Sequence, residues 1–570
     1  MKIKPIYVIS ILGLLLSVLL CGIYFQFSYF EPDTVSYLFQ AKLFAEGKIS
    51  VPAPPEHGFS SSPHINVLNG KWYSKYPFGN ALMLMFGVFI NAPWLIPALA
   101  TGGALLLLYL FVKEIYGNVH PGIALIAAVL ALISPATLGM GSTWFSEPVS
   151  RFYLSLYLLT LLRTLNCKDD ASLLARIGYL LLSGFALGYA FNTRPLSAVV
   201  FGVVGAGLTL YHLFTQWFKV FDYRKPLEGL LTFDHLFTQW QHYHETAQAL
   251  LPTLKRLGFF FIPFVVMLGV CLSWNAHFTE DPFLFTHTVA QPYDKIGFGP
   301  RMEGYEPDLE QARIFTPAWA IERTWRHILP SISFNALGWG SYHHDLLEDI
   351  ELSVTWFIAF VPLVLPWVLV LIPFFHRSRN RYDVFCLSLL IVNLLLYAFF
   401  YFEGSTWGFT PVNARYYTES TFLGFIPLAA RGIFILYERF KPFQRRGLAI
   451  GVGICVLLLS VNIVWSYVRI GKVYQSWDPV YQKLPPMVAE RDIHNAVIFV
   501  PQRRDAPIGD YPFKNLQEAD IVYFKLGPLP QWKLTNSDWQ NVYAQYFTGR
   551  NAYLYDRSEN SLTPLPINPR

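Results

Sequence analysis

Residues 5–34 read PIYVISILGLLLSVLLCGIYFQFSYFEPDT, an apolar run that ends in a short acidic segment. The run is long enough to cross a bilayer, which takes about 20 apolar residues. It follows Lys2 and Lys4, but it is too long for a signal peptide, and no small-residue cleavage site comes after it. We therefore interpret it as a retained first membrane span, which presents Asp33 at the outer membrane surface.

The whole chain has the composition of a membrane protein. Of its 570 residues, 53% are hydrophobic, 17% are aromatic and only 14% are charged, and the mean hydropathy is positive. These values lie outside the range of soluble proteins. The net charge of +5 is small for this length, and the basic residues sit in short clusters between apolar runs. This pattern indicates orientation in a membrane and argues against nucleic-acid binding.

Eleven apolar windows are long enough to be spans. They are residues 7–27, 93–112, 121–138, 148–164, 177–193, 196–214, 257–274, 353–375, 383–402, 420–437 and 448–468. With a cytoplasmic N-terminus, every basic loop falls on the cytoplasmic side, as the positive-inside rule requires. The C-terminus and two long loops, 28–92 and 275–352, then lie outside. The second of these loops carries 12 acidic residues against 5 basic ones.

A change of composition near residue 471 predicts a second domain. Short β-like runs, Ala496–Val500, Ile521–Phe524 and Ala552–Tyr555, are separated there by Pro, Gly and charged turns. The expected fold is thus mainly α, a polytopic transmembrane helical bundle of residues 1–470. A small extramembrane α/β domain, residues 471–570, follows it outside the membrane.

The first outer loop offers two charged residues for chemistry. Asp33 shares one helix face with Tyr37 and Ala41, because the three are four residues apart. A carboxylate there can act as a general base on a hydroxyl, or it can be an ordinary acid favoured at a helix start by the helix dipole. Lys75, in the segment NGKWYSKYPFG of residues 69–79, can neutralise a phosphate leaving group or simply anchor a membrane end.

The order of these elements resembles a known family. The residues that carry the resemblance are Asp33, Tyr37, Ala41, Gly47, the proline-rich residues 51–55 and Tyr73-x-Lys75-x-Pro77. The segment they form resembles the first outer loop of the GT-C membrane glycosyltransferases. The similar branch holds the protein O-mannosyltransferases and lipid A aminoarabinose transferases, with a bacterial family 39-like pattern. Those enzymes start the loop with Asp-Glu and close it with Lys-Pro-Pro-Leu. Here Thr34 follows the Asp, Glu31 precedes it, and the closing element is Lys75-Tyr76-Pro77-Phe78.

Three further positions extend the resemblance on the same membrane face. Glu147-Pro148 begins the fourth span, Arg194-Pro195 lies in a short outer turn, and Arg415-Tyr416-Tyr417 precedes the tenth span. The family has an arginine facing the site at positions like the last two. A guanidinium group can hold two phosphate oxygens at once, although both arginines can also serve as membrane anchors.

The resemblance implies a membrane glycosyltransferase that transfers a monosaccharide from a polyprenyl-phosphate donor to an acceptor hydroxyl, with inversion. The acceptor is a cell-envelope lipid, glycan or protein at the outer face of a bacterial plasma (inner) membrane. Asp33 is expected to take the acceptor proton, and Glu147 to orient the acceptor or hold Asp33. The expected donor-phosphate ligands are Lys75, Arg194 and Arg415, and the expected lining residues are Glu31, Tyr37, Tyr73 and Tyr416.

Two other functions stay open, a transporter or lipid flippase and an O-antigen polymerase or ligase. The sequence contains no Walker A loop, GxGxxG after a strand, HExxH or GxSxG, so we expect no cofactor. His343-His344-Asp345 has no third nitrogen or sulfur ligand at a usual spacing, so we expect no metal. The expected partners are the lipid-linked sugar, its acceptor and membrane lipids, with no nucleic acid.

Overall fold

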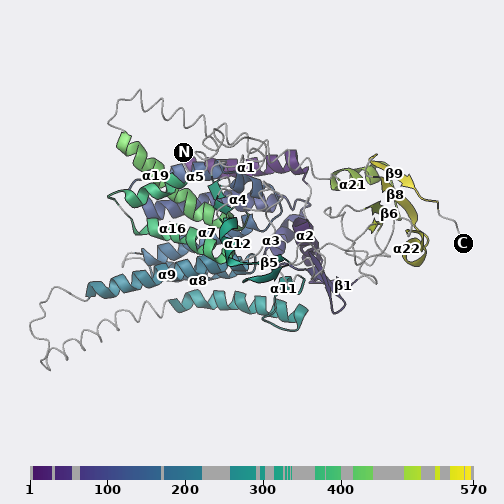
Figure 1. Ribbon diagram of the computed structural model, residues 1–570, viewed down its shortest axis with the longest axis horizontal. Coiled ribbons are helices and arrows are strands. Elements are labelled where there is room, and N and C mark those ends of the chain that lie inside the picture. Colours follow the sequence, from purple (N-terminus) through teal and green to yellow (C-terminus); the bar gives the residue numbers. More distant parts are fainter. Residues whose placement is uncertain are drawn as a thin grey trace, which may run out of the picture.

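The computed structural model describes most of the helical part of the chain and most strands of its C-terminal region (Figure 1). The residues it describes are 4–27, 32–53, 64–167, 172–220, 257–290, 296–301, 313–324, 328–329, 332–333, 336, 366–378, 380–399, 415–440, 480–501, 520–526, 539–556 and 559–566.

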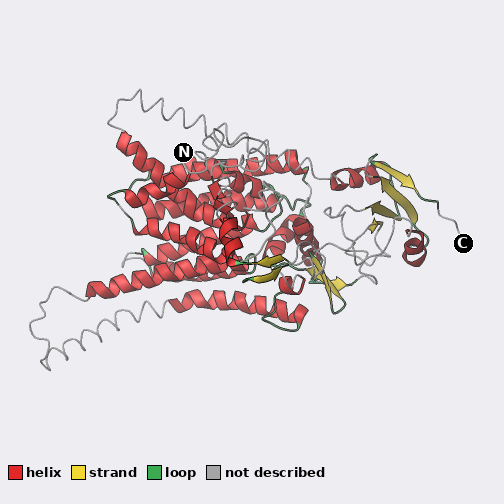
Figure 2. Cartoon of the chain, in the orientation of Figure 1, coloured by secondary structure: helices red, strands yellow, loops and turns green. Residues whose placement is uncertain are grey.

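The described residues contain seven helices that are long and apolar enough to cross a membrane, or eight if one bent pair counts as a span. The seven are α1 Pro5–Phe25, α4 Leu95–Tyr116, α8 Leu173–Phe191, α9 Pro195–Val220, the helix Leu257–Thr279, α16 Arg381–Ala398 and the broken helix Arg415–Arg439. These helices dominate the cartoon in Figure 2. The prediction of a mainly helical, polytopic transmembrane bundle is confirmed.

The remaining predicted spans have different outcomes. Residues 148–164 form α7 Glu147–Leu165, a helix buried along most of its length. Of residues 353–375, only the helix Pro366–Phe375 is described, and residues 448–468 lie outside the described part. The apolar helix α3 Gly79–Phe89 was not predicted as a separate element.

The predicted span 121–138 is a bent pair and not one helix. Helices α5 Gly122–Ile133 and α6 Pro135–Gly141 meet at an angle of 56°. The Ser134 hydroxyl accepts a hydrogen bond from the Thr137 N–H, and Pro135 stands at the first position of the new helix. A serine cap followed by proline is a typical helix start, so the sequence ends one helix here and begins another.

The segment between α1 and α3, predicted as the first outer loop, forms a small unit at one end of the bundle (Figure 1). It contains α2 Pro32–Ala45 and an antiparallel sheet of β1 Val51–Pro52, β3 Lys71–Ser74 and β2 Ile65–Leu68, in the order β1-β3-β2. Asn69 and Gly70 connect β2 to β3 with φ of 51° and 71°. A two-residue hairpin turn needs positive φ at both positions, and Asn-Gly is the pair that supplies it.

Helix α2 is buried on two sides. Val35 and Phe39 pack with Trp72 of the hairpin, whereas Tyr37 and Ala41 pack with side chains of the bundle that include Trp144. The shared face predicted for Tyr37 and Ala41 is therefore the face toward the bundle. Asp33, in the first turn of α2, is held between the hairpin and the membrane helices.

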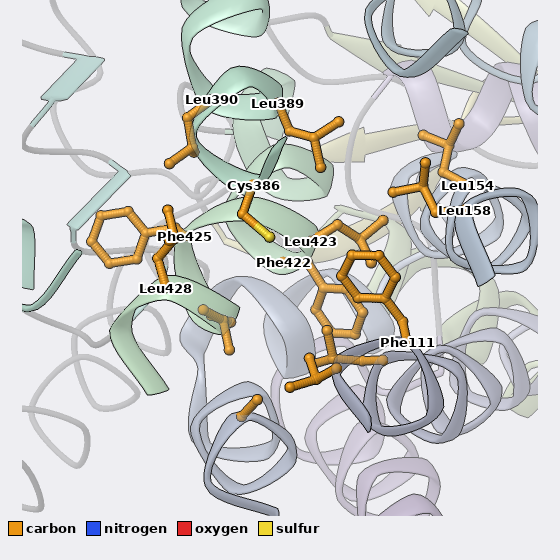
Figure 3. Close-up of a cluster of buried hydrophobic side chains, with 14 of the residues drawn as sticks. Phe111, Leu154, Leu158, Cys386, Leu389, Leu390, Phe422, Leu423, Phe425 and Leu428 are labelled. Atoms are coloured by element: carbon orange, nitrogen blue, oxygen red, sulfur yellow. The ribbon is translucent and has the colours of Figure 1, made fainter. Parts of the chain in front are cut away.

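The centre of the bundle is an apolar core. Its side chains come from α4, α7, α16, the π-helix η5 Thr421–Phe425 and α19 Ile426–Phe440. Figure 3 shows ten labelled members: Phe111, Leu154, Leu158, Cys386, Leu389, Leu390, Phe422, Leu423, Phe425 and Leu428. Close packing of these side chains supplies the attraction between helices in lipid, where the hydrophobic effect is weak.

The C-terminal region folds as an α/β unit. Its four-stranded sheet has the order β7-β6-β8-β9, with β6 parallel to β7 and β8, and β9 antiparallel to β8. The elements are α21 Val480–Glu490, β6 Ala496–Pro501, β7 Ile521–Leu526, α22 Trp539–Tyr546, β8 Asn551–Asp556 and β9 Ser561–Pro564. All three predicted strands are confirmed. The inner strands β6 and β8 contribute side chains to two separate apolar clusters.

Candidate active site

Asp33 accepts its closest contacts from two directions. Tyr76, just after β3, donates a short hydrogen bond to Oδ1 of Asp33, and Nη2 of Arg415 lies 3.3 Å from the same oxygen. Nε2 of His64 lies 3.8 Å from the other oxygen, Oδ2. The Asp33 side chain is 9% exposed, so these partners replace most of its water.

Lys75 lies beside this carboxylate and is also buried, with 2% of the residue exposed. Its Nζ is 5.0 Å from the centroid of the Tyr76 ring. The backbone around it is pinned, because its N–H donates to the His64 carbonyl at 3.1 Å and its carbonyl accepts from the Thr286 hydroxyl at 2.8 Å. Thr286 begins the short helix α11 Thr286–Ala290, so the two segments predicted as outer loops meet at Lys75.

A second carboxylate holds both arginines. Nη1 of Arg194 lies 2.7 Å from Oε1 of Glu147, and Nε of Arg415 lies 3.8 Å from the same oxygen. Nε of Arg194 also lies 3.1 Å from Oε1 of Glu419. Asp33, Arg415, Glu147, Arg194 and Glu419 thus form one continuous chain of ion pairs, which together with Lys75 we call the Asp33 cluster.

Aromatic rings support the charged groups. The Arg415 guanidinium lies 5.1 Å from the Phe145 ring centroid and 5.2 Å from that of Tyr416, and the Arg194 guanidinium lies 5.6 Å from Tyr416. Tyr37 stacks on Tyr76 at 4.6 Å. These flat contacts fix the arginines and the phenol without neutralising any charge.

A helix break brings the last members into place. The broken helix begins with the 3₁₀ turn η4 Arg415–Tyr417 and α18 Thr418–Ser420, then passes through the π-helix η5. Arg415 and Glu419 are four residues apart at this break, and Glu419 is buried. π-helical turns are rare and occur often at functional sites.

The charges around Asp33 control its protonation. Burial would raise the pKa of Asp33, but the positive charges of Arg415 and Lys75 and the hydrogen bond from Tyr76 outweigh burial and hold this pKa well below its usual range. Burial raises the pKa of Tyr76 well above its ordinary value, so the phenol keeps its proton. Asp33 is therefore ionised, and Tyr76 is the donor.

Two histidines near Lys75 stay neutral. Burial, reinforced by the charge of Lys75, lowers the pKa of His64 well below 6.5 and lowers that of His287 to about 3. The contact between His64 and Asp33 is thus a contact with a neutral imidazole at pH 7. Among the described residues, the cations at the site are accordingly lysine and arginine.

With one more buried arginine counted, the described residues around the cluster carry more positive than negative charge. Arg151, one helical turn after Glu147 on α7, is fully buried and donates to the carbonyls of Ala136 and Thr137 at 3.2 and 3.5 Å. With it, four cations face three carboxylates within the described residues. Oε2 of Glu147 has no hydrogen-bond partner there. A buried site with one excess positive charge suits an anion.

The structure brings together Asp33, Lys75, Glu147, Arg194 and Arg415, five residues expected to act in one site. Of the expected lining residues, Tyr37 and Tyr416 contact the cluster. Tyr73 lies elsewhere: its ring stacks on Phe278 at 3.8 Å. Glu31 lies outside the described residues, as do His343 and His344. Glu147 contacts the two arginines, so it acts on Asp33 through Arg415 and not by direct contact.

Sequence reasoning missed Tyr76, His64, His287, Glu419 and Arg151 as members of the site. Two of them had a usable signal. Glu419 follows Arg415 by four residues and Arg151 follows Glu147 by four, the spacing of facing side chains on a helix. His64 and His287 lie in loops, and no periodicity connects them to Asp33.

No group of three or more His, Cys, Asp or Glu side chains with metal-binding geometry occurs among the described residues. The arrangement can instead bind an anion with two arginines and a lysine while it holds an ionised carboxylate nearby. These are the elements needed to remove a proton from one reactant and to stabilise a negative leaving group on another.

No family model matches this chain, and no curated protein matches it. Several solved structures are similar in fold. ArnT from Cupriavidus metallidurans bound to undecaprenyl phosphate has 13% identity and a TM-score of 0.49, covering 97% of this chain and 93% of that one. AglB oligosaccharyltransferase from Archaeoglobus fulgidus, in complex with an inhibitory peptide and a dolichol phosphate, has 14% identity and a TM-score of 0.41, covering 83% and 56%. Arabinofuranosyltransferase AftD from Mycobacteria has 11% identity and a TM-score of 0.44, covering 90% and 31%.

Proposed function

We propose that this protein is a membrane glycosyltransferase that moves a monosaccharide from a polyprenyl-phosphate donor to an acceptor hydroxyl at the outer face of the membrane. The observation that carries the proposal is the Asp33 cluster, in which a buried, ionised carboxylate lies among cations that suit a phosphate. The motif resemblance of the first outer loop points to the same chemistry.

The proposed step is a single displacement. The acceptor hydroxyl attacks the anomeric carbon of the donor sugar, and Asp33 takes the proton of that hydroxyl. The bond from the anomeric carbon to the phosphate oxygen breaks, and its electron pair stays on the phosphate. Lys75, Arg194 and Arg415 stabilise the charge that the leaving polyprenyl phosphate gains. Attack from the face opposite the phosphate inverts the anomeric configuration.

Glu147 and Glu419 serve the arginines in this scheme. Glu147 lies 2.7 Å from Arg194 and 3.8 Å from Arg415, and Glu419 lies 3.1 Å from Arg194. Buried arginines held by carboxylates keep a fixed direction, so the phosphate meets preorganised donors. Glu147 and Glu419 are positioning residues, whereas Asp33, Lys75 and the arginines contact the reactants.

The charge distribution favours transfer over transport. Transport of a charged substrate needs polar groups along the whole path through the bilayer. In the described bundle, the Asp33 cluster lies at one end, and the space beyond it is filled by the apolar core of Figure 3. A second charged group, around Asp383, lies on the far side of that core. The two groups do not line a common path through the described residues.

The test is a donor panel with purified protein in detergent. Polyprenyl-phosphate-linked hexoses and pentoses are incubated singly with candidate acceptors, and release of polyprenyl phosphate is measured. We expect one donor to be consumed and the product anomer to be inverted relative to that donor. Failure to consume any donor or to bind polyprenyl phosphate would overturn the proposal, and a retained configuration would overturn the single displacement.

A further inference from the structure

The contact between Asp33 and Arg415 raises a conflict within the proposed function. Nη2 of Arg415 lies 3.3 Å from Oδ1 of Asp33, and Tyr76 donates to the same oxygen. One oxygen of the carboxylate thus already has two donors, and the other lies 3.8 Å from the neutral His64. The arginine expected to bind the phosphate is at the same time occupied by the carboxylate.

We propose that Arg415 is exchanged between Asp33 and the donor phosphate, so that donor binding uncovers the carboxylate. The inference rests on the proposed function and adds an order of events, in which donor binding precedes proton transfer to Asp33. Without donor, Arg415 keeps Asp33 covered. With donor bound, Arg415 turns to the phosphate, and Asp33 is released for the acceptor hydroxyl.

Geometry permits this exchange without rebuilding the site. Arg415 is held from behind by Oε1 of Glu147 at 3.8 Å and by the rings of Phe145 and Tyr416. These contacts involve its Nε and its flat faces, and Nη2 also donates to the Tyr416 hydroxyl at 3.4 Å. The terminal nitrogens can therefore turn toward a phosphate while Nε and the ring contacts stay in place. The two terminal nitrogens of an arginine can bind two phosphate oxygens at once. In the pair with Asp33, Arg415 contacts only one carboxylate oxygen, at 3.3 Å.

The charges around Asp33 give the exchange a chemical effect. The groups that face Asp33 are of three kinds. The closest are Arg415, Lys75 and Tyr76. The histidines His64 and His287 are neutral, and Tyr37 and Glu147 are more remote. Together the cations hold the pKa of Asp33 well below its usual range, and a carboxylate of low pKa is a weak base. A phosphate that engages Arg415 and Lys75 supplies negative charge to both, so the basicity of Asp33 rises when the donor is present.

The same movement suits the leaving group. During transfer the acceptor proton passes to Asp33, and the phosphate diester of the donor, with one negative charge, becomes a monoester with up to two. Arg415 therefore lies on the phosphate when that charge develops. The neutralised Asp33 no longer competes for the arginine, so the exchange and the chemical step reinforce each other.

The test is a binding cycle with a short-chain polyprenyl phosphate that carries no sugar, so that no turnover occurs. We expect Asp33→Asn to bind this probe about tenfold more tightly than the wild type, because Arg415 no longer has to leave a carboxylate. In an Arg415→Gln background, the same Asp33 substitution should change binding less than twofold. Asp383→Asn removes a buried carboxylate far from the site and should leave binding unchanged.

The outcomes separate the two proposals. If the wild type binds the probe and Asp33→Asn binds equally or more weakly, the exchange is wrong while the proposed function stands. If Asp33→Asn also tightens binding in the Arg415→Gln background, removal of charge acts without Arg415 and the exchange is again wrong. If neither protein binds polyprenyl phosphate, both proposals fail. The thermal unfolding midpoint of each variant shows that the folded protein is compared.

Discussion

Two buried carboxylates, Asp33 and Asp383, each pair with an arginine, and they lie at opposite ends of the bundle. Asp383 lies in the first turn of α16, and Tyr397, near the Asp33 cluster, lies in the last turn. The 14 residue steps between them correspond to a rise of about 21 Å along the helix axis. Nε of Arg431 lies 3.3 Å from Oδ1 of Asp383, as close as Arg415 lies to Asp33. Nevertheless the two sites are built differently.

The Asp383 site is a closed set of contacts. Oδ1 of Asp383 also accepts the Tyr116 hydroxyl at 2.7 Å, and Oδ2 accepts the Asn380 N–H at 2.9 Å as part of a helix cap. Arg431 donates to the Ser378 carbonyl at 2.6 Å. One acid and one base therefore join α4, α16 and α19, and their charges balance within the part of the chain that the structure describes.

The Asp33 cluster is open by comparison. Together with the nearby buried Arg151, its cations number four against three carboxylates among the described residues, and one oxygen of Glu147 has no partner there. A purely structural ion pair needs charge balance, because buried uncompensated charge costs free energy. An imbalance that the fold tolerates indicates a site completed by a ligand. The comparison thus separates a structural pair from a functional cluster, and each prediction below tests that separation.

The largest effect is expected for Asp33→Asn. Loss of the general base should lower the rate of transfer per folded molecule roughly thousandfold. The thermal midpoint should also fall, because Arg415 and Lys75 lose a buried carboxylate partner. Initial rates with the donor found in the panel give the measurement. The matched control is Asp383→Asn, which should keep its rate per folded molecule; an Asp33→Asn rate within tenfold of the wild type would contradict the assignment.

Breaking the ion pair of the Asp383 site should lower the stability of the folded protein and leave its activity unchanged. Arg431→Met leaves Asp383 buried without its cation and should lower the free energy of unfolding by about 3 kcal/mol. The KM for the donor should not change. Unfolding in detergent, followed by denaturant titration, gives the measurement. Adding Asp383→Asn to Arg431→Met should restore part of the lost stability, and no restoration would mean that the pair is not coupled.

Arg194→Gln should act on the donor. This change removes the cation shared by Glu147 and Glu419 and should lower kcat/KM roughly hundredfold, largely through a higher KM for the polyprenyl-phosphate donor. Steady-state kinetics at varied donor concentration separate the two constants. Arg194→Lys keeps the charge and should recover part of the loss; if Lys and Gln behave alike, a charge at this position does not assist the reaction.

The smallest effect concerns pH. The pKa of His287 is lowered from 6.5 to about 3 in the folded protein, so the unfolded chain binds the proton first as pH falls. The contribution of neutral His287 to the free energy of unfolding is complete above pH 6.5 and is lost as the pH falls toward 3. By pH 5 the loss amounts to about 2 kcal/mol. Burial also lowers the pKa of His64, so His64 contributes in the same direction. Thermal midpoints between pH 7.5 and pH 4 should fall less steeply for His287→Gln, and equal slopes would refute a buried neutral His287.

Several features of the site could be predicted from local sequence. The Asn69-Gly70 turn places Lys75 at the end of a hairpin, and the steps of four from Asp33 place Tyr37 on the buried face of α2. Both rules act over a few residues, within one element. The bend at Ser134 carried a local signal as well, a serine followed by a proline, although the apolar window concealed it.

The partners of Asp33 could not be predicted in the same way. Arg415 lies 382 positions away along the chain, and its place depends on the 3₁₀ turn and π-helix that begin the broken helix. His287 reaches the site through α11, whose position follows from contacts with Lys75. Tyr73 lies in β3 two residues before Lys75, but its ring stacks on Phe278 and not on a member of the cluster.

By itself, the sequence determined that this chain crosses a membrane many times, that an α/β unit follows, and that an acid and a lysine share the segment between the first two predicted spans. Hydropathy and short-range spacing suffice for these features because each depends on neighbouring residues. Only the tertiary structure decided which cations meet Asp33, that Glu147 serves the arginines, and that the Asp383 pair is closed. Side chains from distant helices meet according to packing and helix breaks, and neither leaves a periodic pattern in the sequence.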